Sequence, residues 1–169
     1  WFNQTAPGET LAIKYAPVRA AIAHLYFESI HPFEDGNGRI GRAIAEKALS
    51  QGAGYPVMLS LSQAIEADKK AYYAALNLGS KSNEITAWVD YFVHTVLAAH
   101  VEVEKQINFI LQKSTYFNRF EDRLNARQLK VIRRMMQAGV KGFEGGMSAK
   151  KYMVITETSK ATATRDLQD

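Results

Sequence analysis

The sequence contains no cysteine, and no apolar run approaches the ~20 residues that a membrane-spanning helix requires. Without cysteine, the chain can form neither a disulfide framework nor a thiolate metal site. The first residues also lack the basic and then apolar pattern of a secretory signal. Because 47% of the residues are hydrophobic, the chain can bury a core, and its composition excludes a disordered protein. These features predict a cytoplasmic protein that does not associate with membranes.

The positive charge is confined to the last third of the chain. Residues 113–169 hold 12 Lys and Arg against 6 Asp and Glu, whereas residues 1–112 hold 9 against 11. We therefore predict two domains, 1–118 and 119–169, of which the second has its own partners. The chain begins with Trp1 rather than Met and stops inside a predicted helix, so we also expect both domains to be truncated.

The first domain shows helical periodicity and no pattern typical of a strand. Pro17 suits the first turn of a helix, and His31-Pro32 ends that helix because the residue before proline is pushed out of the α region. Residues 1–15 are predicted to form a loop that is preceded by the end of a helix. The predicted helices are Ala16–Ser29, a second from Arg39 to Gly52, a third from Ser60 to Gly79 with a bend near Asp68, and a fourth capped by Thr86 and reaching Asn118. The fold class is all-α.

Residues beyond Arg123 predict three short helices. Asn125 caps the first helix, which Gly139 ends, and Ser148 caps the second. A brief connector at 155–156 precedes a third helix, capped by Thr158 or Ser159 and reaching Asp169. Two helices joined by a short connection are typical of a helix-turn-helix.

One stretch between two predicted helices carries the chemistry, His31-Pro32-Phe33-Glu34-Asp35-Gly36-Asn37-Gly38-Arg39-Ile40-Gly41-Arg42. Gly36 and Gly38 permit backbone angles that bring N–H groups close to a ligand. The helix that follows presents free N–H groups at its N-terminus, where anions bind. This stretch therefore predicts a phosphate-binding loop.

Four charged or titratable side chains complete that prediction. Arg39 and Arg42 lie on one face of the first helical turn and can grip phosphate oxygens. Asp35 offers the oxygen ligand that Mg²⁺ prefers beside phosphates, and His31 can accept a proton near neutral pH. The residues alone thus indicate a Mg²⁺-nucleotide site with a general base at its edge.

The same stretch resembles, at every fixed position, the motif HPFx[D/E]GNGRxxR of Fic (filamentation induced by cAMP) domains. It is not a P-loop, because the Gly-Lys-[Ser/Thr] ending is absent. Most members of the family are all-helical enzymes that move AMP from ATP onto a hydroxyl group of a target protein. A few relatives transfer phosphate or other groups instead, and the motif alone does not separate these reactions.

The resemblance implies a role for each matched residue. His31 corresponds to the base that takes the proton from the target hydroxyl, Phe33 to a core anchor below the loop, and Asp35 to the Mg²⁺ ligand. The cradle for the α- and β-phosphates corresponds to Gly36, Asn37 and Gly38. Arg39 corresponds to the contact with the β- and γ-phosphates, and Arg42 to the contact with the γ-phosphate that orients ATP.

The similarity extends over roughly residues 10–110 and includes the stretches 19–24 and 72–76. Tyr73 occupies the place of the aromatic residue that lines the adenine pocket, although a core tyrosine is an equal alternative. His24, among apolar neighbours on its helix, is predicted to be a satisfied packing residue.

Residues 147–168 resemble a winged-helix module whose recognition helix spans 159–167. Ser159, Lys160, Thr162 and Thr164 are the residues that would meet DNA phosphates or bases. A protein-docking module that binds no DNA is an equal alternative. The wing that would follow lies outside this sequence.

The resulting hypothesis is a Fic-type protein adenylyltransferase that uses ATP and Mg²⁺ to modify a Ser, Thr or Tyr hydroxyl of a target protein. Two alternatives stay open: a DNA-binding regulator that senses nucleotide without turning it over, and a hydrolase that removes AMP from modified proteins.

Overall fold

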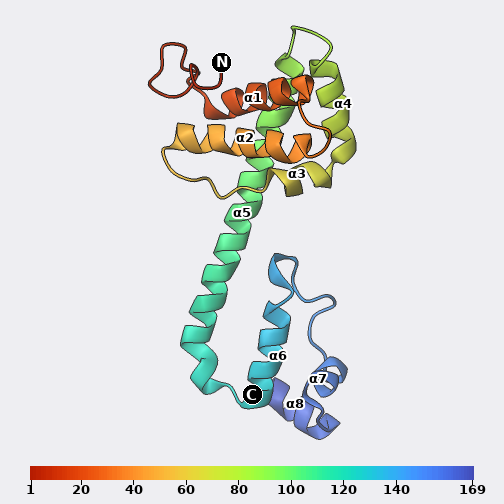
Figure 1. Cartoon of the computed structure of the whole chain (residues 1–169). Coiled ribbons are helices and arrows are strands. Elements are labelled where there is room, and N and C mark those ends of the chain that lie inside the picture. Colours follow the sequence, from red (N-terminus) through yellow and green to blue (C-terminus); the bar gives the residue numbers. More distant parts are fainter. The chain divides into compact units, whose positions relative to one another are not determined.

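The computed structural model describes all 169 residues, and every regular element in it is helical (Figure 1). The all-α prediction is therefore confirmed. The helices are α1 (Ala16–Ile30), α2 (Asn37–Ala53), α3 (Leu61–Ala67), α4 (Lys69–Gly79), α5 (Thr86–Phe120), α6 (Ala126–Met136), α7 (Ala149–Thr156) and α8 (Lys160–Gln168). Two 3₁₀ turns, Glu121–Arg123 and Gly139–Lys141, complete the set. No helix combines the length and the apolar character needed to cross a membrane.

The chain forms two compact units, an N-terminal unit Trp1–Val103 and a C-terminal unit Glu104–Asp169, and the division falls within α5. The sequence places the domain boundary at residue 118 instead, and that domain assignment stays a prediction.

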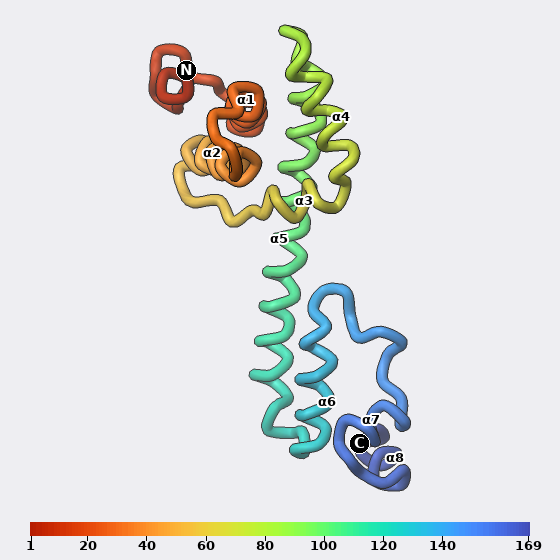
Figure 2. Tube along the Cα trace, turned by 45° about the vertical axis from the view of Figure 1, so that its right-hand side comes forward, coloured from red at the N-terminus to blue at the C-terminus, as the bar shows by residue number.

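Small residues allow α1 and α2 to lie side by side in the N-terminal unit (Figures 1 and 2). Ala20 and Ala21 of α1 and Ala45 and Ala48 of α2 are fully buried. Trp88 of α5 packs into the same core, and its indole N–H donates to the Ala21 carbonyl over 2.8 Å. A tightly packed pair of helices thus fixes the loop that joins them.

Arg19 of α1 holds the first residues of the chain, which form successive turns without a helix remnant. Its buried guanidinium donates to Thr5 Oγ1 over 3.1 Å, to the Phe2 carbonyl over 2.7 Å and to Gln51 Oε1 of α2 over 2.9 Å. The cost of burying this charge is offset because each of its nitrogens has an acceptor.

Most predicted helix ends agree with the structure to within two residues. The bend predicted near Asp68 is confirmed, because Asp68 ends α3 and its side chain accepts from the Ala71 N–H to cap α4. Helix α2 begins at Asn37 rather than Arg39, since Gly36 adopts the left-handed region (φ 89°) that starts the helix early. Thr86 lies inside the first turn of α5 and is not its cap.

The three predicted C-terminal helices are present as α6, α7 and α8. Asn125 caps α6 in a reciprocal pair with Gln128, and Ser148 and Ser159 cap α7 and α8. The predicted connector at 155–156 is wrong: these residues complete α7, and the chain turns at Glu157 in the left-handed region (φ 56°). The winged-helix module is not confirmed and stays a prediction.

Asp166 of α8 lies at the centre of the C-terminal unit. Its carboxylate accepts from Arg127 Nε over 2.6 Å, from the Tyr152 hydroxyl over 2.9 Å and from Asn125 Nδ2 over 3.3 Å. These contacts join α6, α7 and α8. The hydrogen bond from Arg127 is the main reason that the pKa of Asp166 falls from 3.8 to about 2.

We expect Asp166→Asn to destabilise the C-terminal unit at neutral pH, because the amide cannot accept from all three donors. A lowered pKa means that Asp166 stabilises the fold above pH 3.8, and that this contribution disappears as the pH falls through about 2. Faster hydrogen exchange of the α6 amides would report the loss, and the difference from wild type should shrink below pH 3.8. The exposed Asp122→Asn is the control, and equal exchange in both variants would contradict the prediction.

Candidate nucleotide site

The loop of the motif leaves α1 through His31. This residue adopts the left-handed region (φ 48°, ψ 57°), and its backbone N–H donates to the Phe27 carbonyl over 3.0 Å. Histidine is among the few side chains found there with any frequency. The turn exposes the imidazole at the end of the helix, where a second molecule can reach it.

Asn37, the first residue of α2, holds the loop from below. Its side chain is 3% exposed, its Oδ1 accepts from the Phe33 N–H over 3.1 Å, and its Nδ2 donates to the Phe33 carbonyl over 2.5 Å. The Phe33 ring, in contrast, is 49% exposed, so the prediction of Phe33 as a core anchor is wrong. The anchor is the Asn37 amide, because it forms hydrogen bonds with both the N–H and the carbonyl of Phe33.

The N-terminus of α2 presents an anion-binding site. The first intrahelical bond runs from the Ile40 N–H to the Gly36 carbonyl over 3.0 Å. The N–H groups of Asn37, Gly38 and Arg39 therefore have no partner within the helix. Together with the helix dipole they favour negative charge at this point.

A cavity of about 320 Å³ opens beside this helix terminus. It brings together six residues that the sequence predicts for the site, Asp35, Gly36, Gly38, Arg39, Arg42 and Tyr73. His31 and Asn37 are not part of its lining, since one caps α1 and the other lies under the loop. The cavity lies within the range of roughly 300–1,000 Å³ that is usual for small-molecule sites.

The opposite wall of the cavity comes from α3 and α4 and was not predicted. It consists of Ser62, Ile65, Glu66, Lys69 and Tyr72. The Lys69 ammonium lies 3.3 Å from Glu66 Oε2, and both side chains are exposed. No local pattern marks these residues, because they reach the site only through packing of the helices.

The two tyrosines of α4 have different roles. Tyr72 is 4% exposed and its hydroxyl lies 2.9 Å from His24 Nε2, so it belongs to the core. Tyr73 is 57% exposed and stands edge-on to Tyr72 with ring centres 5.1 Å apart. The core alternative for Tyr73 is therefore excluded, and its ring is free to stack against a ligand.

His24 is fully buried, and burial lowers its pKa to about 4, so the imidazole is neutral at physiological pH. Its ring stacks on Trp88 with centres 5.8 Å apart. The packing role predicted for His24 is confirmed, but the side chain is not fully satisfied, because Nδ1 has no hydrogen-bond partner.

Asp35 is the only acidic residue of the motif loop that lines the cavity, and Arg39 lines it as well. Its Oδ2 lies 3.0 Å from Arg39 Nη2, and its Oδ1 accepts from the Gly36 N–H over 2.6 Å. No group of three or more His, Asp or Glu side chains could hold a metal ion by itself. A single carboxylate nevertheless fits Mg²⁺ when substrate phosphates and waters supply the other ligands.

The predicted recognition helix corresponds to α8. The hydroxyls of Ser159 and Thr162 lie 3.1 Å apart, and the Thr164 hydroxyl donates to the Lys160 carbonyl of the same helix over 2.9 Å. Lys160 is exposed. Since three of the four predicted contact residues are engaged within the helix, DNA binding stays a prediction.

Comparison with known proteins places the first part of the chain near one family. Residues 4–49 match the family model of the Fic/DOC family. A Fido domain-containing protein of Dictyostelium discoideum is 42% identical over 84 residues, which are 49% of this chain and 52% of that protein. These findings support a Fic domain in the N-terminal unit.

Two further relatives are named for an activity. The protein adenylyltransferase Fic of Drosophila mojavensis is 32% identical over 83 residues, covering 49% of this chain and 15% of that protein. The protein adenylyltransferase fic-1 of Caenorhabditis briggsae is 31% identical over 116 residues, covering 67% of this chain and 21% of that protein. The chain thus spans about half the length of the first relative and at most about a fifth of the other two.

Proposed function

We propose that the Fic domain supported by these similarities is a protein adenylyltransferase, which moves AMP from ATP onto a Ser, Thr or Tyr hydroxyl of a target protein. One observation carries the proposal. The motif loop feeds the N-terminus of α2, and the cavity there has Arg39 and Arg42 on one side and Tyr73 on the other. Such an arrangement suits a ligand with a polyphosphate chain and a flat ring.

The phosphates of ATP bind at the positive end of the site. The N–H groups at the start of α2 donate hydrogen bonds to the inner phosphates, and Gly38 lets these phosphates approach closely. The guanidinium groups of Arg39 and Arg42 hold the outer phosphates as planar forks. The Asp35 carboxylate is the group that would hold Mg²⁺, which when bound neutralises phosphate charge. The Tyr73 ring contacts the adenine.

The transfer step then follows. The hydroxyl oxygen of the target attacks the α-phosphorus of ATP, and a new O–P bond forms. The bond between the α-phosphorus and the bridging oxygen of the β-phosphate breaks, so pyrophosphate leaves. The imidazole of His31 takes the hydroxyl proton, because it is exposed beside the loop and a neutral imidazole nitrogen can act as a general base. Most of the acceleration comes from holding the reactants in line.

Labelling with ATP that carries ³²P at either the α- or the γ-phosphate distinguishes the proposed reaction from its alternatives. We expect α-³²P-ATP with Mg²⁺ to label a protein, in a cell lysate or in the chain itself, and γ-³²P-ATP to leave protein unlabelled. Label from the γ-position alone would mean phosphate transfer and would overturn the proposal. Nucleotide binding without any label would favour a sensing role, and release of AMP from a modified protein would favour the hydrolase.

A further inference from the structure

Glu28 of α1 and Arg42 of α2 each bury a polar atom without a partner. Glu28 Oε1 lacks a donor, and Arg42 Nε lacks an acceptor. Such atoms are costly, because each loses its bonds to water on folding and gains nothing in return. The two needs are complementary, since a carboxylate oxygen accepts what an Nε–H donates.

Gly41 makes room for the Glu28 carboxylate at the surface of α2. A Cβ atom at Gly41 would lie 2.5 Å from Glu28 Oε1 and 3.0 Å from His24 Nδ1. The absence of a side chain at this position therefore lets the carboxylate lie directly against the backbone of α2. The next residue along that helix is Arg42, whose side chain borders the cavity.

The charged groups around Glu28 also favour an interaction between Glu28 and Arg42. The groups that act on Glu28 electrostatically or lie close to it are His24 of α1, His31 just after α1, Arg42 of α2 and Tyr72 of α4. Burial raises the pKa of Glu28, while His31 and Arg42 lower it. His24 is neutral and Tyr72 is not ionised, so Arg42 is the permanent positive charge that faces this carboxylate.

We propose that Glu28 is a positioning residue: when the nucleotide is bound, its Oε1 accepts a hydrogen bond from Arg42 Nε, which has no partner in this structure, and so aims the outer nitrogens of that guanidinium at the terminal phosphate. The inference rests on the proposed function and extends it to a residue outside the motif. Arginine has five N–H groups in a fixed fork, so Nε can bind Glu28 while the two terminal nitrogens bind phosphate. Fixing Nε removes rotational freedom that phosphate binding would otherwise have to restrict.

The preference for ATP over ADP measures this role, because Arg42 is the residue assigned to the γ-phosphate. We expect Glu28→Gln to lower that preference by roughly fivefold, since the amide keeps the shape but not the charge that strengthens the bond to Arg42. Simple loss of a negative charge near the site would act in the opposite direction and favour ATP. Glu34→Gln removes the same charge from an exposed position in the loop and should change the preference less than twofold.

A double-mutant cycle tests whether Glu28 acts through Arg42. Arg42→Lys retains a positive charge but has no Nε–H, so in that background Glu28→Gln should change the ATP preference less than twofold. Calorimetry with ATP and ADP gives the affinities, and NMR of the ATP complex should show the Arg42 Nε–H protected from exchange in wild type and unprotected in Glu28→Gln.

The outcomes are distinguishable. An unchanged or increased ATP preference in Glu28→Gln, or an equal effect in the Arg42→Lys background, would overturn the positioning role and leave the proposed function standing. A wild-type chain that binds neither nucleotide would overturn both. Because glutamine keeps the shape of the side chain and an acceptor oxygen, the thermal midpoint of Glu28→Gln should change little, and a large fall together with equal losses of ATP and ADP affinity would indicate a purely structural residue.

Discussion

Replacing His31 with alanine is expected to abolish transfer of AMP while leaving ATP affinity within about twofold of wild type. The phosphate contacts come from α2 and the base from the end of α1, and His31 does not line the cavity. A positioned general base contributes roughly 10²–10⁴-fold to a rate, so the loss should be of that size. Labelling with α-³²P-ATP gives the rate, and calorimetry gives the affinity.

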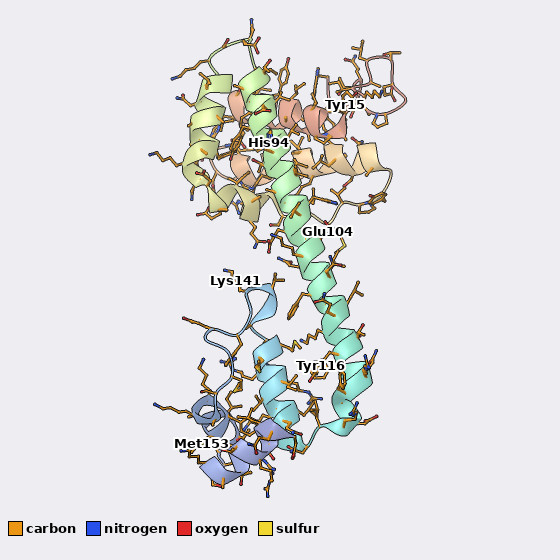
Figure 3. All side chains as sticks on the ribbon, turned by 180° about the vertical axis from the view of Figure 1, so that it is seen from behind. Tyr15, His94, Glu104, Tyr116, Lys141 and Met153 are labelled. Atoms are coloured by element: carbon orange, nitrogen blue, oxygen red, sulfur yellow. The ribbon has the colours of Figure 1, made fainter.

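The backbone at His31 requires a second variant. Alanine is strained in the left-handed region that His31 occupies (φ 48°), whereas asparagine adopts it readily and is no base at neutral pH. His31→Asn should therefore lose transfer as completely as His31→Ala, with a smaller loss of stability. His94→Ala is the control, because that exposed histidine, labelled in Figure 3, bonds only to Asp90 of its own helix. Wild-type labelling by His31→Asn would show that another group takes the proton.

The part of the site that the sequence predicts is the part that is contiguous in the chain. The motif places Asp35, Gly36, Gly38 and Arg39 within five residues, so loop and helix geometry alone bring them together. Capping chemistry was equally informative, since Asn125, Ser148 and Ser159 begin helices at the predicted positions. Such signals depend on neighbours in sequence and need no knowledge of packing.

Packing decided the features that the sequence did not predict. Ser62, Glu66 and Lys69 reach the cavity because α3 packs against α2 and leads into α4, and no periodicity reveals that. The break predicted at 155–156 fails because the chain turns at Glu157, a residue type that rarely adopts the left-handed region and gives no sequence signal. Nothing in the sequence around Glu28 distinguishes it from other polar residues on a helix. Its role becomes visible only because the fold places Gly41 beside it.

The structure assigns Asn37 a different role from the one that the sequence predicts. Replacing it should strongly reduce AMP transfer. The sequence assigns it to the phosphate cradle, yet both polar atoms of its side chain bind the Phe33 backbone. Its contribution to the cradle is therefore limited to its backbone N–H. Asn37→Ala would leave the N–H and carbonyl of Phe33 without partners and release the loop between His31 and Gly36.

We expect Asn37→Ala to reduce AMP transfer by roughly 10²-fold, because a displacement of about 1 Å between base and nucleotide costs that much. Asn37→Asp separates the two bonds, since it can still accept from the Phe33 N–H but repels the Phe33 carbonyl, and it should be nearly as damaging. The exposed Asn108→Ala is the matched control and should label protein at the wild-type rate. If Asn37→Ala instead weakened ATP binding by the same factor and left single-turnover transfer from bound ATP unchanged, Asn37 would belong to the phosphate cradle after all.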